Sequence, residues 1–139
     1  MKREQALANY SAAWNAPGAE AITAAFARCW TDRTTFTDTI TNTIVGIAPM
    51  VQLVLDTAAR YPGFTLHPVG DLDTHHTVGQ FSWRMTAPDP IVAAGVDYGR
   101  ELHGLDFVEF DADNRIARIV GFFLQQDQPS ATMSHVVAP

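Results

Sequence analysis

Three oxygen-bearing side chains, Tyr10, Asp38 and Asp106, each lie in a segment that is otherwise typical of buried structure. Tyr10 falls on the apolar stripe of a predicted helix, Asp38 ends the strand-like run 34–38, and Asp106 interrupts the apolar run 102–108. Burying a carboxylate costs on the order of several kcal/mol unless the group is paired or protonated. We therefore expect these residues to line a pocket, where carboxyl and phenol groups could take up and release protons.

Each of these residues also has a purely structural alternative. Tyr10 could be a core tyrosine with a bonded hydroxyl group. Asp38 could accept hydrogen bonds in a turn at the end of its strand. Asp106 could form a structural ion pair with Arg84.

Aromatic residues predict the walls of an apolar pocket. The side chains expected to contact a substrate are Trp14, Trp30, Phe36, Trp83 and Phe122.

No metal or cofactor site is expected. The adjacent His75 and His76 would face opposite sides of a strand and could not bind one ion together.

Length and composition indicate a single domain over residues 1–139, with a core at about 4–124 and a polar tail at 125–139. Hydrophobic residues make up 47% of the chain and charged residues 17%, below the roughly 25% of an ordinary globular protein. This low charged share favours a surface partly covered by a second copy, and hence a homodimer. The net charge is −6 and no basic cluster occurs, so neither nucleic acid nor an anionic membrane is an expected partner.

Targeting and redox signals are sparse. The one cysteine, Cys29, excludes a disulfide within the chain and falls on the apolar face of a predicted helix. The N-terminus lacks the apolar stretch of a signal peptide, and no run of about 18 apolar residues could span a bilayer. We therefore expect a cytoplasmic protein.

The apolar periodicity changes from helical to alternating near the middle of the chain. Helices are predicted at about 4–15, from after Pro17-Gly18 to Trp30, and from about Pro49 to Tyr61. Two short extended pieces are predicted within 34–45, and longer strands at 64–69, 75–86, 101–110 and 115–124. Helices followed by an antiparallel meander predict an α+β domain. The Pro/Gly-rich stretch 87–99 is expected to be a connection.

Several short segments share their order and spacing with one group of proteins. They are Tyr10–Ala16 (YSAAWNA), Trp30–Asp38 (WTDRTTFTD), Tyr61–Phe64 (YPGF), Phe81–Arg84 (FSWR), Gly104–Phe110 (GLDFVEF) followed by Arg115-Ile116, and Gly121–Phe123 (GFF). Together they resemble the nuclear transport factor 2-like superfamily, in its SnoaL-like and ketosteroid isomerase-like branch. The resemblance implies three helices from the N-terminal half packed on a strongly curved, mixed or antiparallel sheet, which forms a cone with a pocket.

The resemblance also implies roles for the three oxygen-bearing residues. In ketosteroid isomerase, a first-strand aspartate is the base, and a helix-one tyrosine and a late-strand aspartic acid bind the enolate oxygen. Asp38, Tyr10 and Asp106 occupy the matching places. The implied protein is a cofactor-independent acid–base enzyme for an apolar carbonyl compound, acting by isomerisation or by polyketide cyclase-like ring closure.

Three alternatives within the same fold stay open. The protein could bind a hydrophobic metabolite without turning it over, or its cone could be filled by its own side chains and serve only interaction. It could also be an epoxide hydrolase-like enzyme. That similarity is weaker, because limonene epoxide hydrolase has an arginine two residues before its late-strand aspartate, where this chain has Gly104.

Overall fold

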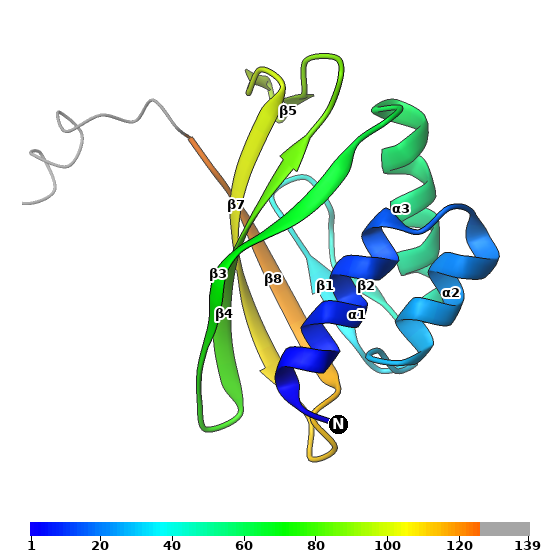
Figure 1. Ribbon diagram of the computed structural model, residues 1–139, viewed down its shortest axis with the longest axis vertical. Helices are drawn as coiled ribbons and strands as arrows, with labels where there is room; N and C mark the ends of the chain where they lie inside the picture. Colours follow the sequence, from blue (N-terminus) through cyan, green and yellow to red (C-terminus); the bar gives the residue numbers. More distant parts are fainter. Residues whose placement is uncertain (126–139) are drawn as a thin grey trace, which may run out of the picture.

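The computed structural model describes residues 1–125, so the predicted tail lies outside the described residues from position 126 onward. Within this range, three helices cover one face of a six-stranded sheet (Figure 1). The helices are α1 (Arg3–Asn15), α2 (Ala19–Ala27) and α3 (Ile47–Arg60). The strands of the sheet are β1 (Thr35–Thr37), β2 (Ile44–Val45), β3 (Thr65–His75), β4 (Val78–Thr86), β7 (Glu101–Phe110) and β8 (Ile116–Leu124).

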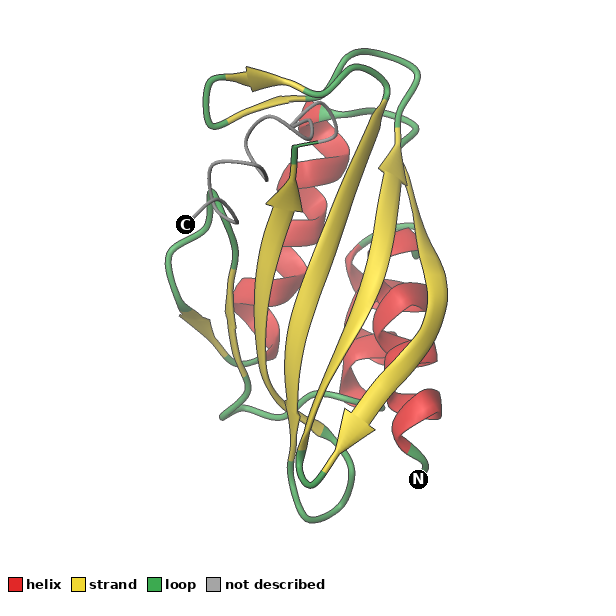
Figure 2. Cartoon of the chain, turned by 90° about the vertical axis from the view of Figure 1, so that its left-hand side faces the viewer, coloured by secondary structure: helices red, strands yellow, loops and turns green. Residues whose placement is uncertain are grey.

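The sheet has the order β2-β1-β8-β7-β4-β3. β1 runs parallel to β8, and every other neighbouring pair is antiparallel. Figure 2 looks onto the face that the helices leave uncovered, with the long strands bending across the view. The prediction of an α+β domain with three helices on a curved, mixed sheet is therefore confirmed. None of the three helices is long and apolar enough to cross a membrane.

Three predicted boundaries are wrong. α2 ends at Ala27 rather than at Trp30, but the backbone N–H groups of Cys29 and Trp30 both donate to the Phe26 carbonyl, at 3.0 and 2.8 Å. The apolar stripe therefore continues through the turn that follows the helix. β3 does not stop at Val69 but runs on to His75, because a bulge between Val69 and Asp73 accommodates Gly70, Asp71 and Leu72. The next strand, β4, therefore begins at Val78 rather than at His75, after a turn at 76–77.

The connection at 87–99 is more ordered than composition indicates. It contains a small hairpin of β5 (Val92–Ala93) and β6 (Val96–Asp97), which forms a separate two-stranded sheet. The hydroxyl group of Tyr61, at the end of α3, donates to the Val92 carbonyl at 2.8 Å. This bond ties the hairpin to the helix layer.

Side chains at both ends of α1 fix this helix against the sheet. At its start, the Arg3 guanidinium donates to Thr74 Oγ1 at 2.8 Å and to the His76 carbonyl at 2.6 Å. At its end, the Asn15 amide exchanges two 2.8 Å hydrogen bonds with the backbone of Leu66 in β3. Polar groups at the two ends thus set the position of Tyr10 on the helix between them.

Two apolar clusters make up the interior. The larger joins the three helices to the end of the sheet near the turn between β7 and β8, and it includes Tyr10 and Phe36. The smaller lies toward the other end and includes Met85, Ile91 and Leu102. Members of both clusters line one pocket, so the pocket lies where the two clusters meet.

Candidate active site

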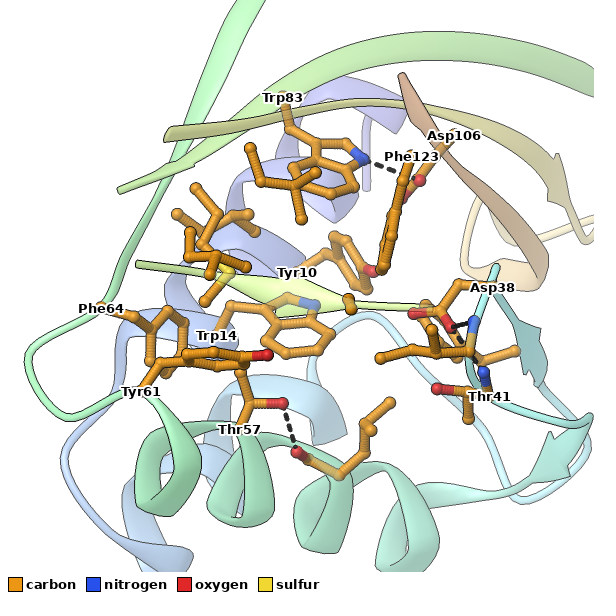
Figure 3. A pocket seen from close by; sticks show the side chains of 18 residues that line it. Tyr10, Trp14, Asp38, Thr41, Thr57, Tyr61, Phe64, Trp83, Asp106 and Phe123 are labelled. Carbon is orange, nitrogen blue, oxygen red and sulfur yellow. Dashed lines mark hydrogen bonds between the residues drawn. The ribbon is translucent and has the colours of Figure 1, made fainter. Parts of the chain in front are cut away.

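The pocket is a largely apolar cavity with a few convergent polar groups (Figure 3). It contains about 700 Å³ of empty space when the solvent at its mouth is included. The residues that line it are Tyr10, Trp14, Phe36, Asp38, Ile40, Thr41, Leu53, Thr57, Tyr61, Phe64, Leu66, Trp83, Met85, Ile91, Ala93, Leu102, Asp106 and Phe123. None of these is Lys, Arg or His, and the only carboxyl groups among them are those of Asp38 and Asp106.

The sheet register brings the two acids together. Asp106 in β7 is paired with Gly121 in β8, and β1 runs beside β8 with Thr37 opposite Val120. Asp38 follows Thr37 directly and therefore reaches the level of Gly121. A Cβ atom built on Gly121 would lie 2.8 Å from Asp106 Oδ1 and 3.2 Å from Asp38 Cβ. The bare glycine is what lets the two carboxyl groups approach each other.

Asp106 is almost completely buried, with 4% of its surface exposed. Trp83 Nε1 donates a hydrogen bond to its Oδ1 at 2.8 Å. Burial raises the pKa of Asp106 to about 7; the Trp83 bond opposes the rise, and the nearby charge of Asp38 adds to it. Near neutral pH this acid is therefore divided between a protonated form, which can donate a hydrogen bond, and an ionised form.

Gly104 makes the Trp83–Asp106 bond possible. Trp83 in β4 is the cross-strand partner of Gly104 in β7, and a Cβ atom on Gly104 would overlap the Trp83 ring. The indole can therefore lie across β7 and reach the carboxyl two residues farther along the strand. A side chain at this position would exclude that arrangement.

Asp38 is both a turn residue and a pocket residue. Its Oδ1 accepts backbone hydrogen bonds from Ile40 at 3.0 Å and from Thr41 at 2.8 Å, which hold the turn after β1. Burial raises the pKa of Asp38, while these hydrogen bonds lower it. The net rise makes Asp38 a stronger base than an exposed aspartate, and one that is still able to ionise.

Tyr10 is buried in a cage of aromatic rings. It stacks on Trp30, with 5.7 Å between ring centroids, and contacts Phe26 and Phe81 edge-on at 6.3 and 6.1 Å. Burial raises the pKa of Tyr10 well above its usual value, and the charge of Asp106 adds to the rise. The hydroxyl group, which lines the pocket, therefore stays protonated and can donate (Figure 3).

Comparison with known proteins identifies the architecture. No family model matches the chain, and no curated protein matches its sequence. A SnoaL-like family protein from Agrobacterium tumefaciens, provisionally named an isomerase, has a TM-score of 0.73 and 24% identity over 88% of this chain and 97% of its own. A nuclear transport factor 2-like protein of unknown function from Exiguobacterium has a TM-score of 0.67 and 16% identity, over 87% and 99% of the two chains. The chain has the nuclear transport factor 2-like fold.

The nuclear transport factor 2-like fold holds proteins with different names among the solved structures that match this chain. SalBIII, an epoxide hydrolase/cyclase-like enzyme in pyran ring formation, has a TM-score of 0.63 and 15% identity, over 90% of this chain and 92% of its own. Others carry a ketosteroid isomerase-like fold or are SnoaL-like. Identities this low establish the fold and leave the reaction to be argued from the pocket itself.

The nuclear transport factor 2-like cone brings Tyr10, Asp38 and Asp106 to one cavity, as the sequence predicts. Of the five expected wall residues, Trp14, Phe36 and Trp83 line the cavity. The other two, Trp30 and Phe122, do not.

Trp30 and Phe122 lie away from the pocket. Trp30 is 1% exposed, donates from Nε1 to the Gly46 carbonyl at 3.2 Å, and supports Tyr10 from behind. Phe122 is 52% exposed, because the alternation of β8 turns it to the face opposite Gly121. Its neighbour Phe123 lines the pocket instead, as the residue two positions after the inward-facing Gly121.

The alternative in which Asp106 forms a structural ion pair with Arg84 is also wrong. Arg84 is the cross-strand partner of His103 on the outer face of the sheet, and its guanidinium lies 3.7 Å from Glu101. The partner of Asp106 is an indole N–H. Within residues 1–125, no group of three or more His, Cys, Asp or Glu is placed to hold a metal ion.

Proposed function

We propose that this protein is an acid–base enzyme that moves a proton next to the carbonyl group of an apolar compound. One observation supports this most directly: Tyr10, Asp38 and Asp106 come from three different elements and meet in one pocket with apolar walls. Each of the three has a pKa above its usual value, mainly because of burial. The pocket thus offers both a base, Asp38, and two hydrogen-bond donors, Tyr10 and protonated Asp106, to one ligand.

The reaction needs only these groups. The Asp38 carboxylate takes a proton from the carbon next to the carbonyl, and the electron pair of the broken C–H bond forms a C=C bond. The carbonyl π pair moves to the oxygen, where Tyr10 and protonated Asp106 donate hydrogen bonds to the enolate. Asp38 then returns the proton to another carbon of the conjugated system, which completes an isomerisation. In a cyclase-like reaction, the enolate carbon instead attacks the carbon of a second carbonyl group, whose π pair moves to its oxygen and takes the proton held by Asp38, while the first carbonyl re-forms.

The charges of the pocket favour a neutral ligand. Its two carboxyl groups have no cationic side chain beside them among the lining residues, so an anionic ligand would meet unscreened repulsion in an apolar site. Seven of the lining residues are aromatic, from Tyr10 to Phe123, which suits a flat ring system. A neutral ketone with fused rings satisfies both conditions.

Deuterium uptake by 2-tetralone, a fused-ring ketone, tests the proposal. We expect the protein in D₂O to exchange the protons next to the carbonyl, followed by proton NMR, and Asp38→Asn to slow the exchange by about 10²-fold or more. Asparagine keeps the carbonyl oxygen that accepts the turn hydrogen bonds. The matched control is Asp71→Asn, an exposed acid in the β3 bulge outside the pocket, which should exchange at the wild-type rate. Equal rates for the wild type and Asp38→Asn would reject Asp38 as the base.

A non-catalytic binder of a hydrophobic metabolite is the second candidate. It is favoured by the two backbone hydrogen bonds to Asp38, which lower its basicity and are sufficient to explain an aspartate at this turn. Binding of 2-tetralone with no exchange above the background rate would support this candidate. An epoxide hydrolase-like reaction would require Asp106 to act with a partner other than arginine, since Trp83 holds it.

We also propose that the protein is a homodimer assembled through the uncovered face of the sheet. Val69, Ser82, Leu105 and Phe122 form one cross-strand row on this face, and Val69 and Phe122 are 40% and 52% exposed. Exposed apolar side chains in one row favour a covering partner. Light scattering should give twice the mass of one chain, and Phe122→Glu should give the mass of a monomer.

A further inference from the structure

The indole N–H of Trp14 is a buried hydrogen-bond donor for which the proposed reaction has no use. Among the side chains that the structure describes, Trp14 Nε1 is the one buried nitrogen or oxygen without a hydrogen-bond partner. Leaving a buried donor unpaired costs about 1–3 kcal/mol, and most native structures avoid it. The group therefore needs an explanation, and its place in the pocket suggests one.

Trp14 stands directly beside the proposed oxygen-binding group. It follows Tyr10 by four residues on α1, so the two side chains share one face of the helix. Their ring centroids are 6.5 Å apart and their planes are at 78°. Figure 3 shows the indole nitrogen on the side of the ring that faces Tyr10 and Asp38. Trp14 also interacts with the Tyr10 hydroxyl as a hydrogen-bond donor would, which lowers the pKa of Tyr10 while burial raises it, but the geometry of this contact falls short of a hydrogen bond.

Packing holds the indole of Trp14 in this orientation. The ring contacts Phe36 and Phe64, each with 6.4 Å between centroids. The other two tryptophans of the chain have partners for their N–H groups: Trp30 donates to the Gly46 carbonyl, and Trp83 donates to Asp106. The unpaired indole is therefore a local feature of the pocket and not a general property of this aromatic-rich core.

We propose that the Trp14 N–H donates to the same ligand oxygen as Tyr10, so that a bound ketone supplies the missing acceptor. The inference rests on the ligand class of the proposed function and extends it, because it adds a specificity group to the oxygen-binding site. It follows that the pocket distinguishes a ketone from a hydrocarbon of the same shape through Trp14. A hydrocarbon would leave the donor unpaired, whereas a carbonyl oxygen removes the penalty.

Equilibrium dialysis with two ligands of one shape tests this inference. 2-Tetralone and tetralin share a bicyclic frame and differ in the carbonyl oxygen. We expect Trp14→Phe to weaken the binding of 2-tetralone about tenfold and to change that of tetralin less than twofold. Trp30→Phe is the matched control, because it removes an indole that touches Tyr10 but does not line the pocket. It should leave the ratio of the two affinities unchanged.

Three results would overturn the inference: equal losses for both ligands in Trp14→Phe, an unchanged affinity for 2-tetralone, or no binding of either ligand by the wild-type protein. Deuterium exchange on the same variants separates it from the proposed function. Asp38-dependent exchange without a Trp14-dependent preference for the ketone would refute the inference alone. A Trp14-dependent preference without exchange would refute the catalytic proposal and leave a ketone-binding pocket.

Discussion

The substitution Gly121→Ala tests the geometry of the pocket most directly, because Gly121 lies between the two acids and lets them approach without contributing a functional group. An alanine Cβ at this position would lie 2.8 Å from Asp106 Oδ1, whereas ordinary contacts begin at 3.4 Å. The Asp106 carboxyl would have to withdraw by the difference, about 0.6 Å. It is held on its other side by the 2.8 Å bond from Trp83, so this movement distorts or breaks that bond.

The size of the displacement sets the size of the expected effect. A misplacement of about 1 Å at a reacting centre can cost about 10²-fold in rate. A shift of roughly 0.6 Å at one donor therefore predicts a loss of about ten- to a hundredfold in kcat/KM. The extra methyl group also approaches Asp38 Cβ at 3.2 Å, so the base is pushed as well as the donor.

The assay is deuterium exchange on 2-tetralone, with thermal unfolding followed by circular dichroism to show that each variant is folded. Gly79→Ala is the matched control. Its Cβ would meet the Asp73 carbonyl at 2.9 Å, a clash of the same kind in the same sheet but outside the pocket. We expect Gly79→Ala to lose stability and keep its activity per folded molecule. If Gly121→Ala retained the wild-type rate, the two carboxyl groups would not act together.

Two further predictions concern Asp106 and its hydrogen bond. Because the pKa of Asp106 is about 7 in the folded protein and 3.8 in an unfolded chain, the folded state binds the extra proton between these values, and this stabilisation is lost as the pH rises through 7. Between pH 4 and pH 8, the free energy of unfolding of the wild type in urea should therefore fall by up to about 4 kcal/mol more than that of Asp106→Asn. A difference between the two proteins that does not change with pH would contradict a raised pKa for Asp106. In a pH profile of kcat/KM, activity should decline above about pH 7 as Asp106 loses its proton. Trp83→Phe removes a hydrogen bond that favours the ionised form of Asp106, so this variant should show the decline about one pH unit higher. A decline that stayed in place or moved lower would show that Trp83 does not control Asp106.

The fold was largely predictable because its signals are local. The apolar stripe of α3 and the alternation along β7 are periodic patterns that single segments carry. The errors occurred where a long-range contact overrides a local signal. β3 continues past Val69 because β4 pairs with it on both sides of a bulge, and no residue of 70–73 by itself favours a strand.

The oxygen-bearing residues of the pocket were predictable because a polar residue in an apolar segment needs a reason. Tyr10, Asp38 and Asp106 carry that signal in their own neighbourhoods. The walls were less predictable, since a one-residue error in a strand moves a side chain to the opposite face, as Phe122 shows. Had Gly121 been recognised as the inward partner of Asp106, alternation would have selected Phe123.

The features that set the pKa of Asp106 could not have been predicted from local patterns, because two of them are glycines, which act by leaving space for a neighbour. Gly104 and Gly121 contribute no side chain, and each matters only because a particular partner lies across the strand: the Trp83 indole over Gly104, and the Asp106 carboxyl beside Gly121. Glycine within a strand usually weakens it, so the sequence alone gives a reason to expect a bulge or a close approach without naming the partner. The strand register identifies the partner in each case, and both glycines affect the pKa of Asp106. One glycine admits the donor that holds the pKa of Asp106 near 7, and the other admits the carboxylate whose charge raises it.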